Sequence, residues 1–275
     1  MNGFDVELVG KIGSMALIER KSNRLNYSRI AALADELRPG YIWVTSGATE
    51  IGRLDYIRRT GKELTGSAED NKTDYSAQGQ AILMQTYRQF IHPNYSLRQV
   101  LIEHRHFNEP EKREHLKRLL LRAKEQGAIP IVNYNDAVCA EENRKWEIES
   151  IQRRNGHAVE CVDNDETAAQ IARLVHAETL LILTNTDGIY TDVSSETGLV
   201  EEIAGKDIPE VLAAIDYYTG FCSGASRAGA NGAGAKLRYI KPAVEEGTKV
   251  IIANAKYAVR EILSGGVPAT RIGVK

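Results

Sequence analysis

Two lysines stand in sequence surroundings that suit the handling of an anion. Lys236 closes a run of small residues, "RAGANGAGAKL" at 227–237, and Lys11 stands in "GKIGS" at the end of an apolar run. Glycine lets the main chain approach an anion closely and point successive N–H groups at it, and each lysine adds a positive charge. A flexible loop without a ligand has the same composition, so these residues alone leave both interpretations open.

The spacing around Lys236 excludes a P-loop. A P-loop places its lysine directly after the last glycine and a Ser or Thr after that, whereas Ala235 separates Gly234 from Lys236 and Leu237 follows. The preceding segment, "YYTGFCSGAS", also lacks the apolar strand from which a P-loop grows.

The elements that must position these lysines follow from the apolar pattern. Short apolar runs predict strands at 6–12, 41–47, 97–103, 128–136, 178–191 and 248–255. Amphipathic stretches predict helices at 27–38, 75–91, 109–127 and 165–177. This alternation predicts an α/β fold, a mostly parallel sheet sandwiched between helices. Polar or small-residue segments at 60–74, 139–160 and 217–233 are predicted to be loops.

Polar residues collect where the predicted strands stop. The runs end in "KIGS", "TSGA", "NYND" and "TNTDG", and "VDNDET" opens a helix. Ligands of an open α/β sheet bind beyond the carboxyl ends of its strands, so we expect these residues to line one rim. Because the rim has no Ser-His-Asp order, no histidine cluster of a metal-binding type and no cysteine nucleophile, it predicts electrostatic handling of an anion rather than covalent catalysis.

Composition restricts the partners. The chain of 275 residues has 35 Lys and Arg against 37 Asp and Glu and no basic block, which argues against a nucleic-acid partner. No apolar run approaches the roughly 20 residues of a membrane span, and the N-terminus has an early Asp and Glu instead of a leader pattern, so we expect a cytoplasmic protein that binds no membrane. The three cysteines lack a C-x-x-C spacing, which favours reduced thiols over disulfides or a zinc site.

Six motifs occur in order along nearly the whole chain, from about residue 6 to 274. They are "VGKIGS", "VTSGATEIG", "AQGQAILMQTY", "IPIVNYNDAV", "VDNDETAAQIARLVHAETLLILTNTDGIYT" and "GANGAGAKL". Together they resemble the amino acid kinase family, and within it most closely the glutamate 5-kinases.

The resemblance implies a single kinase domain over 1–275, with an acceptor-binding half at about 1–165 and an ATP-binding half at about 166–275. The chain ends where the family's kinase domain ends, so we expect no PUA domain. The implied activity is ATP-dependent phosphorylation of the γ-carboxylate of L-glutamate, the entry step to proline. The implied cofactor is Mg²⁺, held mainly by ATP phosphates and water with no metal site of the protein's own, and the implied assembly is a homo-oligomer, dimer or tetramer.

The resemblance also gives roles to the two lysines. Lys11 and Lys236 would be the catalytic pair, and Asp165 would lie between them and orient them. A carboxylate acceptor is already ionised, so the protein has to bring two anions together and neutralise the transferred group, without a general base. Two plainer interpretations stay open: Lys11 as a solvated lysine at a strand end, and Asp165 as a helix N-cap.

Substrate contacts follow from the same resemblance. Ser46, Gly47 and Ala48 would hold the amino acid through hydroxyl and N–H groups, and Asn133, Asp136 and Asn164 would bind its α-amino and carboxylate ends, with Asp136 facing the ammonium. The alternative for "NYND" is a polar turn. Gly10 would keep side chains away from the phosphates. The residues expected to bind ATP are Lys11, Gly13, Ser14, Thr184, Asn185, Asp187, Gly232, Gly234 and Lys236.

The chain departs from the glutamate 5-kinase pattern in three places. Asn185 stands where Asp is usual, and the small-residue segment has Ala230, Asn231 and Ala235 in place of Thr, Gly and Thr. An extra stretch, 139–161, follows "NYNDAV" close to the expected acceptor site. Two alternatives therefore stay open: a kinase of this fold with another acceptor, such as a nucleoside monophosphate, carbamate or a phosphonate, and a catalytically silent nucleotide-binding regulatory protein.

Overall fold

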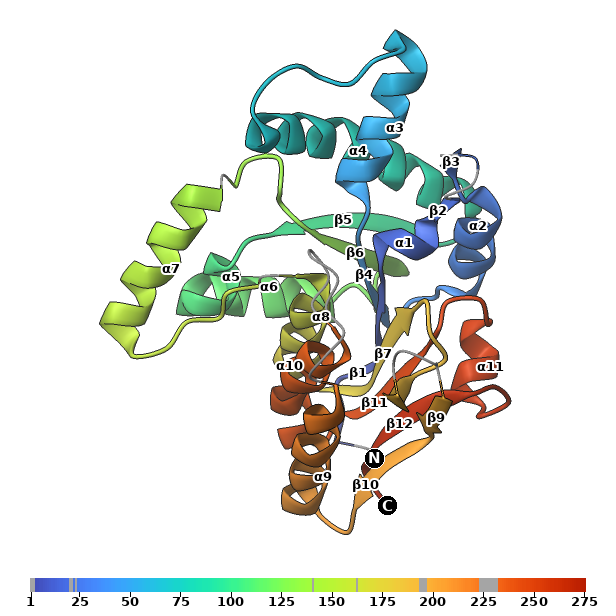
Figure 1. Cartoon of the computed structure of the whole chain (residues 1–275), viewed down its shortest axis with the longest axis vertical. Helices are drawn as coiled ribbons and strands as arrows, with labels where there is room; N and C mark the ends of the chain where they lie inside the picture. The colour runs from blue at the N-terminus through green and yellow to red at the C-terminus, as the bar shows by residue number, and fades with distance from the viewer. Residues whose placement is uncertain are drawn as a thin grey trace. The chain divides into compact units, whose positions relative to one another are not determined.

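The computed structural model describes residues 3–19, 22, 24–139, 141–161, 163–192, 197–222 and 232–275 (Figure 1). The strands are β1 (Val6–Ile12), β2 (Ile18–Glu19), β3 (Arg24–Leu25), β4 (Tyr41–Thr45), β5 (Ser96–Ile102), β6 (Ala128–Tyr134), β7 (Ala177–Thr184), β8 (Ile189–Asp192), β9 (Thr197–Val200), β10 (Glu202–Gly205), β11 (Lys249–Asn254) and β12 (Ala269–Val274). The helices are α1 (Ser14–Leu17), α2 (Tyr27–Glu36), α3 (Ala48–Thr60), α4 (Ala68–Phe90), α5 (Arg105–Asn108), α6 (Pro110–Leu121), α7 (Glu141–Asn155), α8 (Asn164–Leu174), α9 (Ile208–Phe221), α10 (Ala233–Glu245) and α11 (Val259–Leu263).

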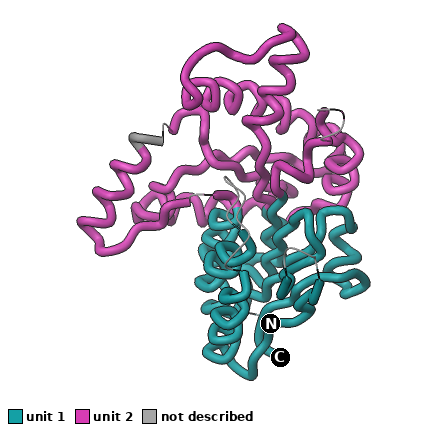
Figure 2. Tube along the Cα trace, viewed as in Figure 1, with its two compact units in different colours: residues 1–12, 40–42, 165–275 teal, residues 13–39, 43–164 magenta. Residues whose placement is uncertain are grey.

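Eight strands form the main sheet, in the order β10-β12-β11-β7-β1-β4-β6-β5. The pairs β1–β7, β7–β11, β4–β6, β5–β6 and β10–β12 are parallel, and β11–β12 is antiparallel. Helices flank the strands, so the predicted α/β fold with a mostly parallel sheet is confirmed. The chain divides into two compact units, coloured separately in Figure 2: unit 1 comprises 1–12, 40–42 and 165–275, and unit 2 comprises 13–39 and 43–164.

Unit 1 is built on β1, β7, β11, β12 and β10. Strand β7, which pairs in parallel with β1 and β11, buries four consecutive residues, Leu180 to Leu183, because an interior strand of a parallel sheet is covered on both faces. Helices α9 and α10 pack together and against β10, β11 and β12. Val250 and Ile252, which point to one face of β11, are at most 1% exposed, whereas Ile251 between them is half-buried.

Unit 2 contains β5, β6, most of β4 and the helices from α1 to α7. Trp43, Leu83 and Tyr87 are fully buried in its core, and the hydroxyl of Tyr87 is 3.1 Å from that of Thr45 at the end of β4. All seven residues of β6 are buried. Burial of the whole strand therefore fixes the position of Asn133, which belongs to the polar cluster described below.

Two glycines fix the contact between α3 and α4 in unit 2. A Cβ added to Gly79 of α4 would lie 1.8 Å from the carbonyl oxygen of Ala48, and one added to Gly52 of α3 would lie 1.9 Å from that of Tyr75. The two backbones touch, so no side chain fits at either position. The "AQGQ" motif thereby sets the position of the first turn of α3, which follows the predicted substrate residues Ser46 and Gly47.

The three predicted loops are wrong in part. Helix α4 begins at Ala68, seven residues earlier than predicted, because the Ser67 side chain caps it by accepting from the Asp70 N–H at 3.0 Å. Segment 139–160 contains helix α7, whose many charged residues give no apolar stripe for a sequence pattern to detect. Within 217–233, α9 continues to Phe221 and α10 begins at Ala233, and 223–231 lie outside the described residues.

Candidate functional site

The carboxyl ends of three parallel strands meet in unit 1. Lys11 of β1 pairs in register with Ile182 of β7, and Thr184 at the end of β7 pairs with Asn254 of β11. This is the rim at which the sequence analysis placed Lys11 and Thr184.

A buried carboxylate at this rim joins two lysines. One oxygen of Asp165 lies 2.5 Å from the Lys11 ammonium, and the other lies 2.7 Å from the Lys236 ammonium. The side chain of Asp165 is only 4% exposed, those of Lys11 and Lys236 are 11% and 20% exposed, and so solvent screens these pairs weakly. Since α8 begins at Asn164, Asp165 lies inside its first turn and not at the N-cap position.

The electrostatics of these three residues suit an incoming anion. Burial alone would raise the pKa of Asp165, but the charges of Lys11 and Lys236 outweigh burial and hold this pKa below its ordinary value. The carboxylate is therefore ionised at neutral pH, and the three groups carry one net positive charge. Lys11 lies on β1 and Lys236 on α10, and the net positive charge of the three groups can attract a phosphate group.

Lys236 enters this arrangement from the first turns of α10. Gly232 is the N-cap residue of α10, with no side chain to cap the helix, and Lys236 is the fourth residue of the helix. A Cβ on Gly234 would lie 3.2 Å from the Cβ of Cys222, so Gly234 lets α10 approach α9 closely. The departures at Ala230 and Asn231 lie outside the described residues.

The loop after β7 is tied to the end of β11. The Asn254 side chain donates to the backbone oxygen of Asn185 at 2.9 Å, and the Lys256 ammonium lies 2.8 Å from Asp187. Lys256 also lies 4.6 Å from the centre of the Tyr257 ring. Predicted residues Asn185 and Asp187 are thus held next to a third lysine at this rim.

Unit 2 contains a second polar cluster, made of four amide and hydroxyl side chains. The Asn164 amide donates to the Ser46 hydroxyl at 2.9 Å and to the Asn133 side-chain oxygen at 3.3 Å, and the Asn133 amide donates to Gln80 at 2.9 Å. Two buried atoms of this cluster, the Asn164 Oδ1 and the Gln80 Nε2, have no hydrogen-bond partner among the described residues. An unpaired acceptor and donor in one buried cluster fit a polar ligand that supplies the missing partners.

The loop after β4 adds main-chain groups to unit 2. Gly47 has φ +96°, a left-handed conformation that glycine adopts without strain, and it begins α3 at Ala48. A Cβ on Gly47 would lie 3.5 Å from Ser14, so predicted residues Ser14 and Gly47 are neighbours. Gly13 precedes them as the N-cap residue of α1.

Asp136 lies just beyond β6 and already faces an ammonium group. The Lys72 Nζ is 3.6 Å from its carboxylate, whose side chain is 26% exposed. Burial raises the pKa of Asp136 above its ordinary value, while the charges of Lys72 and Arg144 oppose that rise. Asp136 thus pairs with a lysine ammonium in this structure, and its contact with a substrate amino group stays a prediction.

Three residues at these clusters escaped the sequence analysis. Gln80 stands in the "AQGQ" motif, which was used only for the family resemblance, and its buried amide contacts Asn133. Asn254 is the last residue of β11 and Lys256 stands two residues later, but the end of this predicted strand was not included in the rim. Applying the same strand-end rule to 248–255 would have found both.

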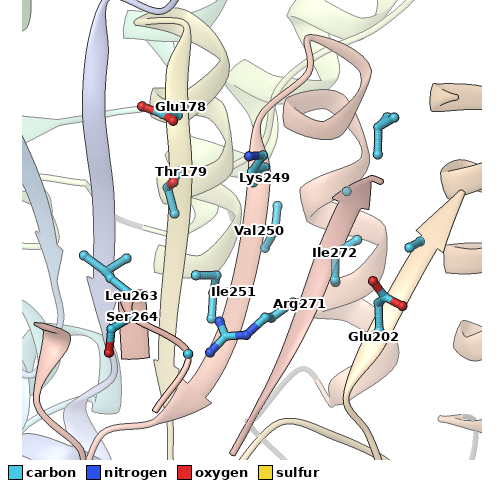
Figure 3. A pocket seen from close by; sticks show the side chains of 14 residues that line it. Glu178, Thr179, Glu202, Lys249, Val250, Ile251, Leu263, Ser264, Arg271 and Ile272 are labelled. Carbon is cyan, nitrogen blue, oxygen red and sulfur yellow. The ribbon is translucent and has the colours of Figure 1, made fainter. Parts of the chain in front are cut away.

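The sheet of unit 1 also has a hollow of about 460 Å³ away from this rim. Figure 3 shows side chains of Thr179, Lys249, Arg271 and Glu202 around it. Thr179 and Lys249 stand near the amino ends of β7 and β11, and the hollow contains none of the predicted site residues.

In the part of the chain that the structure describes, no helix is both long and apolar enough to cross a membrane. Among the same residues, no group of three or more His, Cys, Asp or Glu side chains is placed to hold a metal ion.

Comparison with known proteins identifies relatives along almost the whole chain. The family model described as "Amino acid kinase family" matches residues 7–254. A glutamate 5-kinase of Bacteroides thetaiotaomicron is 30% identical over 256 residues, which cover 90% of this chain and 63% of that protein. Glutamate 5-kinase 1 of Bacillus subtilis is 28% identical over 279 residues, 98% of this chain and 69% of the relative. The chain thus spans roughly two thirds of the length of these relatives.

Solved structures show the same fold at lower sequence identity. A protein from Aeropyrum pernix K1 has a TM-score of 0.58 and 14% identity, with 98% of this chain and 99% of that chain covered. The UMP kinase from Ureaplasma parvum has a TM-score of 0.54 and 12% identity, with 98% of each chain covered. At these identities the similarity concerns the fold alone.

Proposed function

Because the chain belongs to the amino acid kinase family, we propose that it transfers the γ-phosphoryl group of ATP to the γ-carboxylate of L-glutamate. The products are γ-glutamyl phosphate and ADP. The observation that carries the proposal is the buried carboxylate of Asp165, paired on its two oxygens with Lys11 and Lys236. The glutamate 5-kinase relatives support the choice of acceptor.

The reaction has a simple balance of atoms and charge. A γ-carboxylate oxygen of glutamate attacks the terminal phosphorus, a new P–O bond forms, and the bond from this phosphorus to the ADP oxygen breaks. No proton has to be removed, so the chemical demand on the protein is positioning and neutralisation of charge on the transferred oxygens. Lys11 and Lys236 meet that demand, and Asp165 keeps both ammonium groups directed to one place.

We assign the nucleotide to unit 1. Phosphate groups would contact Lys11 and Lys236, and the loop of Thr184, Asn185 and Asp187 would contact the rest of the nucleotide. Gly232 and Gly234 are the remaining predicted contacts in unit 1, whereas the predicted contacts Gly13 and Ser14 belong to unit 2 and stay predictions from the family resemblance. Mg²⁺ would enter with ATP, held by phosphate oxygens and water, and would offset phosphate charge.

We assign the acceptor to unit 2. Asp136 would bind the α-ammonium of glutamate, in place of the Lys72 ammonium that it faces at 3.6 Å. Asn133, Asn164 and Ser46 would offer hydrogen bonds, with Gly47 and Ala48 contributing main-chain N–H groups. The unpaired Asn164 Oδ1 and Gln80 Nε2 would be completed by the ligand. The boundary near residue 165 is also a boundary between the units, but residues 1–12 and 40–42, which the sequence analysis assigned to the acceptor-binding half, belong to unit 1.

A measurement of ADP release across acceptors tests the proposal. The protein is supplied with Mg-ATP and, in separate reactions, L-glutamate, UMP, carbamate or a small phosphonate. Hydroxylamine is added in parallel reactions, because it converts an acyl phosphate into a stable hydroxamate. We expect ADP release and hydroxamate formation only with L-glutamate.

The other outcomes each support a different function. ADP release with UMP, carbamate or the phosphonate, and none with glutamate, identifies a kinase of another acceptor. Nucleotide binding without turnover on any acceptor identifies a silent regulatory protein. Either result overturns the glutamate proposal.

A further inference from the structure

Helix α7 is anchored to the rest of unit 2 by one carboxylate. Glu147 lies 3.0 Å from the Nε2 of His104, a fully buried histidine next to the end of β5. The same carboxylate pairs with the guanidinium of Arg105 in α5. Burial lowers the pKa of His104, so its ring is neutral near pH 7, and its Nε2 lies close to Glu147 without forming a hydrogen bond among the described residues. These contacts fix one face of α7.

Arg144 lies on the same face of α7, because it precedes Glu147 by three residues. Its guanidinium carbon lies 5.5 Å from the centre of the Tyr134 ring, at the end of β6. Its Nε is buried and donates to no group in the described part of the chain. Tyr134 and Asn133 are successive residues of β6 and point to opposite faces, so the link to the predicted acceptor residues is Asp136, two residues beyond Tyr134, on whose carboxylate the charge of Arg144 acts. Helix α7 thus brings a guanidinium with an unused Nε donor near this carboxylate.

The charged side chains near Asp136 have a net positive charge, which favours binding of an anion. Lys72 pairs with Asp136, and Arg144 acts on the same carboxylate as a second cation. Asp136, Lys72 and Arg144 together carry one net positive charge. An amino dicarboxylate such as glutamate carries one net negative charge at pH 7, from two carboxylates and one ammonium.

The predicted acceptor residues provide no cation for the second carboxylate. Ser46, Gly47, Ala48, Asn133 and Asn164 are neutral, and Asp136 repels an anion. The γ-carboxylate is the one that is phosphorylated, so the α-carboxylate needs its own partner. A guanidinium binds a carboxylate through two parallel N–H donors, which Lys cannot do.

We propose that the Arg144 guanidinium, brought to the end of β6 by helix α7, binds the α-carboxylate of the acceptor. This inference rests on the proposed function. It makes helix α7 a specificity element that selects acceptors with an anionic group in addition to the one that is phosphorylated.

The test compares two acceptors and two matched variants. The acceptors are L-glutamate and its α-amide, which keeps the γ-carboxylate and the α-ammonium but has no charged α-carboxylate. The variants are Arg144→Gln and Arg153→Gln. The second is a control on the same helix, because the Arg153 side chain is 72% exposed and pairs with Glu149. KM and kcat are measured for wild type and both variants with each acceptor.

The expected result is a rise in KM for L-glutamate of about tenfold or more in Arg144→Gln, the loss of one charge-assisted interaction, with little change in kcat. KM for the α-amide should be the same in wild type and Arg144→Gln, and Arg153→Gln should behave as wild type. Arg144→Lys should recover part of the affinity for glutamate.

Two results would overturn the inference, and they differ. If wild type phosphorylates glutamate and Arg144→Gln changes KM equally for both acceptors, or for neither, Arg144 does not bind the α-carboxylate and the proposed function stands. If wild type phosphorylates neither acceptor, the proposed function fails and the inference fails with it. Matching melting temperatures of the two Gln variants exclude misfolding as the cause of a changed KM.

Discussion

Replacing Asp165 by Asn tests the carboxylate that joins the two lysines. The change keeps the size of the side chain and removes its charge. Each ion pair, at 2.5 and 2.7 Å, has a gross attraction of about 6 kcal/mol at an effective dielectric constant of 20. Much of this attraction is offset by the cost of burying the charges, but removing one partner of a buried pair leaves the others uncompensated and costs about 3–5 kcal/mol. We expect the free energy of unfolding to fall by about that amount.

A double-mutant cycle separates this electrostatic cost from other effects of the substitution. The variants are Asp165→Asn, Lys236→Met and the double variant, and urea unfolding is followed by far-ultraviolet circular dichroism. Without Asp165 the two ammonium groups repel each other, so removing Lys236 as well should recover at least about 1 kcal/mol relative to the sum of the single effects. Additivity within about 0.5 kcal/mol would refute the view that Asp165 holds both lysines.

Three further predictions concern other parts of the molecule. Gly79→Ala should lower the free energy of unfolding by about 3 kcal/mol or more, because its Cβ would lie 1.8 Å from the Ala48 oxygen. Gly220→Ala in α9, where no atom lies within 4 Å of the added Cβ, should instead raise it by about 0.5 kcal/mol, and equal effects in chemical denaturation would contradict the α3–α4 contact. Asp136 binds an ammonium group in its ionised form, and burial raises the pKa of this carboxyl above the ordinary value of 3.8. As the pH falls, Asp136 therefore becomes protonated before the pH reaches 3.8, and KM for glutamate should rise in that range. A pH profile of Asp136→Asn with the same rise in KM would show that another group is responsible. Lys256→Met should raise KM for ATP with little change in kcat, since Lys256 lies 2.8 Å from Asp187 in the proposed nucleotide loop, and an unchanged KM would remove Lys256 from that site.

The sheet was predictable because its strands are short apolar runs that end in polar residues. Segments 6–12 and 128–136 gave β1 and β6 almost to the residue, since buried parallel strands are apolar on both faces. Helix α7 was not predictable in this way because it is held by charged contacts at Glu147 and not by an apolar stripe. The early start of α4 was signalled by Ser67, a capping residue that the search for apolar periodicity did not include.

Part of the candidate site could also be predicted from the sequence. The resemblance to the amino acid kinase family predicted that Lys11, Asp165 and Lys236 lie together, although Asp165 and Lys236 are 71 positions apart in the chain. Arg144 was not identified because its relevance depends on how α7 packs, and no local pattern encodes a contact between a helix and the Tyr134 ring. Contacts made by exposed polar elements need the three-dimensional structure.

The central claim is that Lys11 and Lys236 together neutralise the transferred phosphoryl group. The most direct measurement is the rate of phosphoryl transfer to L-glutamate in Lys236→Met at saturating ATP and glutamate, with the fold checked by circular dichroism. A lysine about 4 Å from a phosphoryl oxygen contributes up to about 4 kcal/mol at an effective dielectric constant of 20, which is roughly three decades of rate. We therefore expect a fall of about a thousandfold with the secondary structure retained, whereas a rate within about tenfold of wild type would contradict the claim.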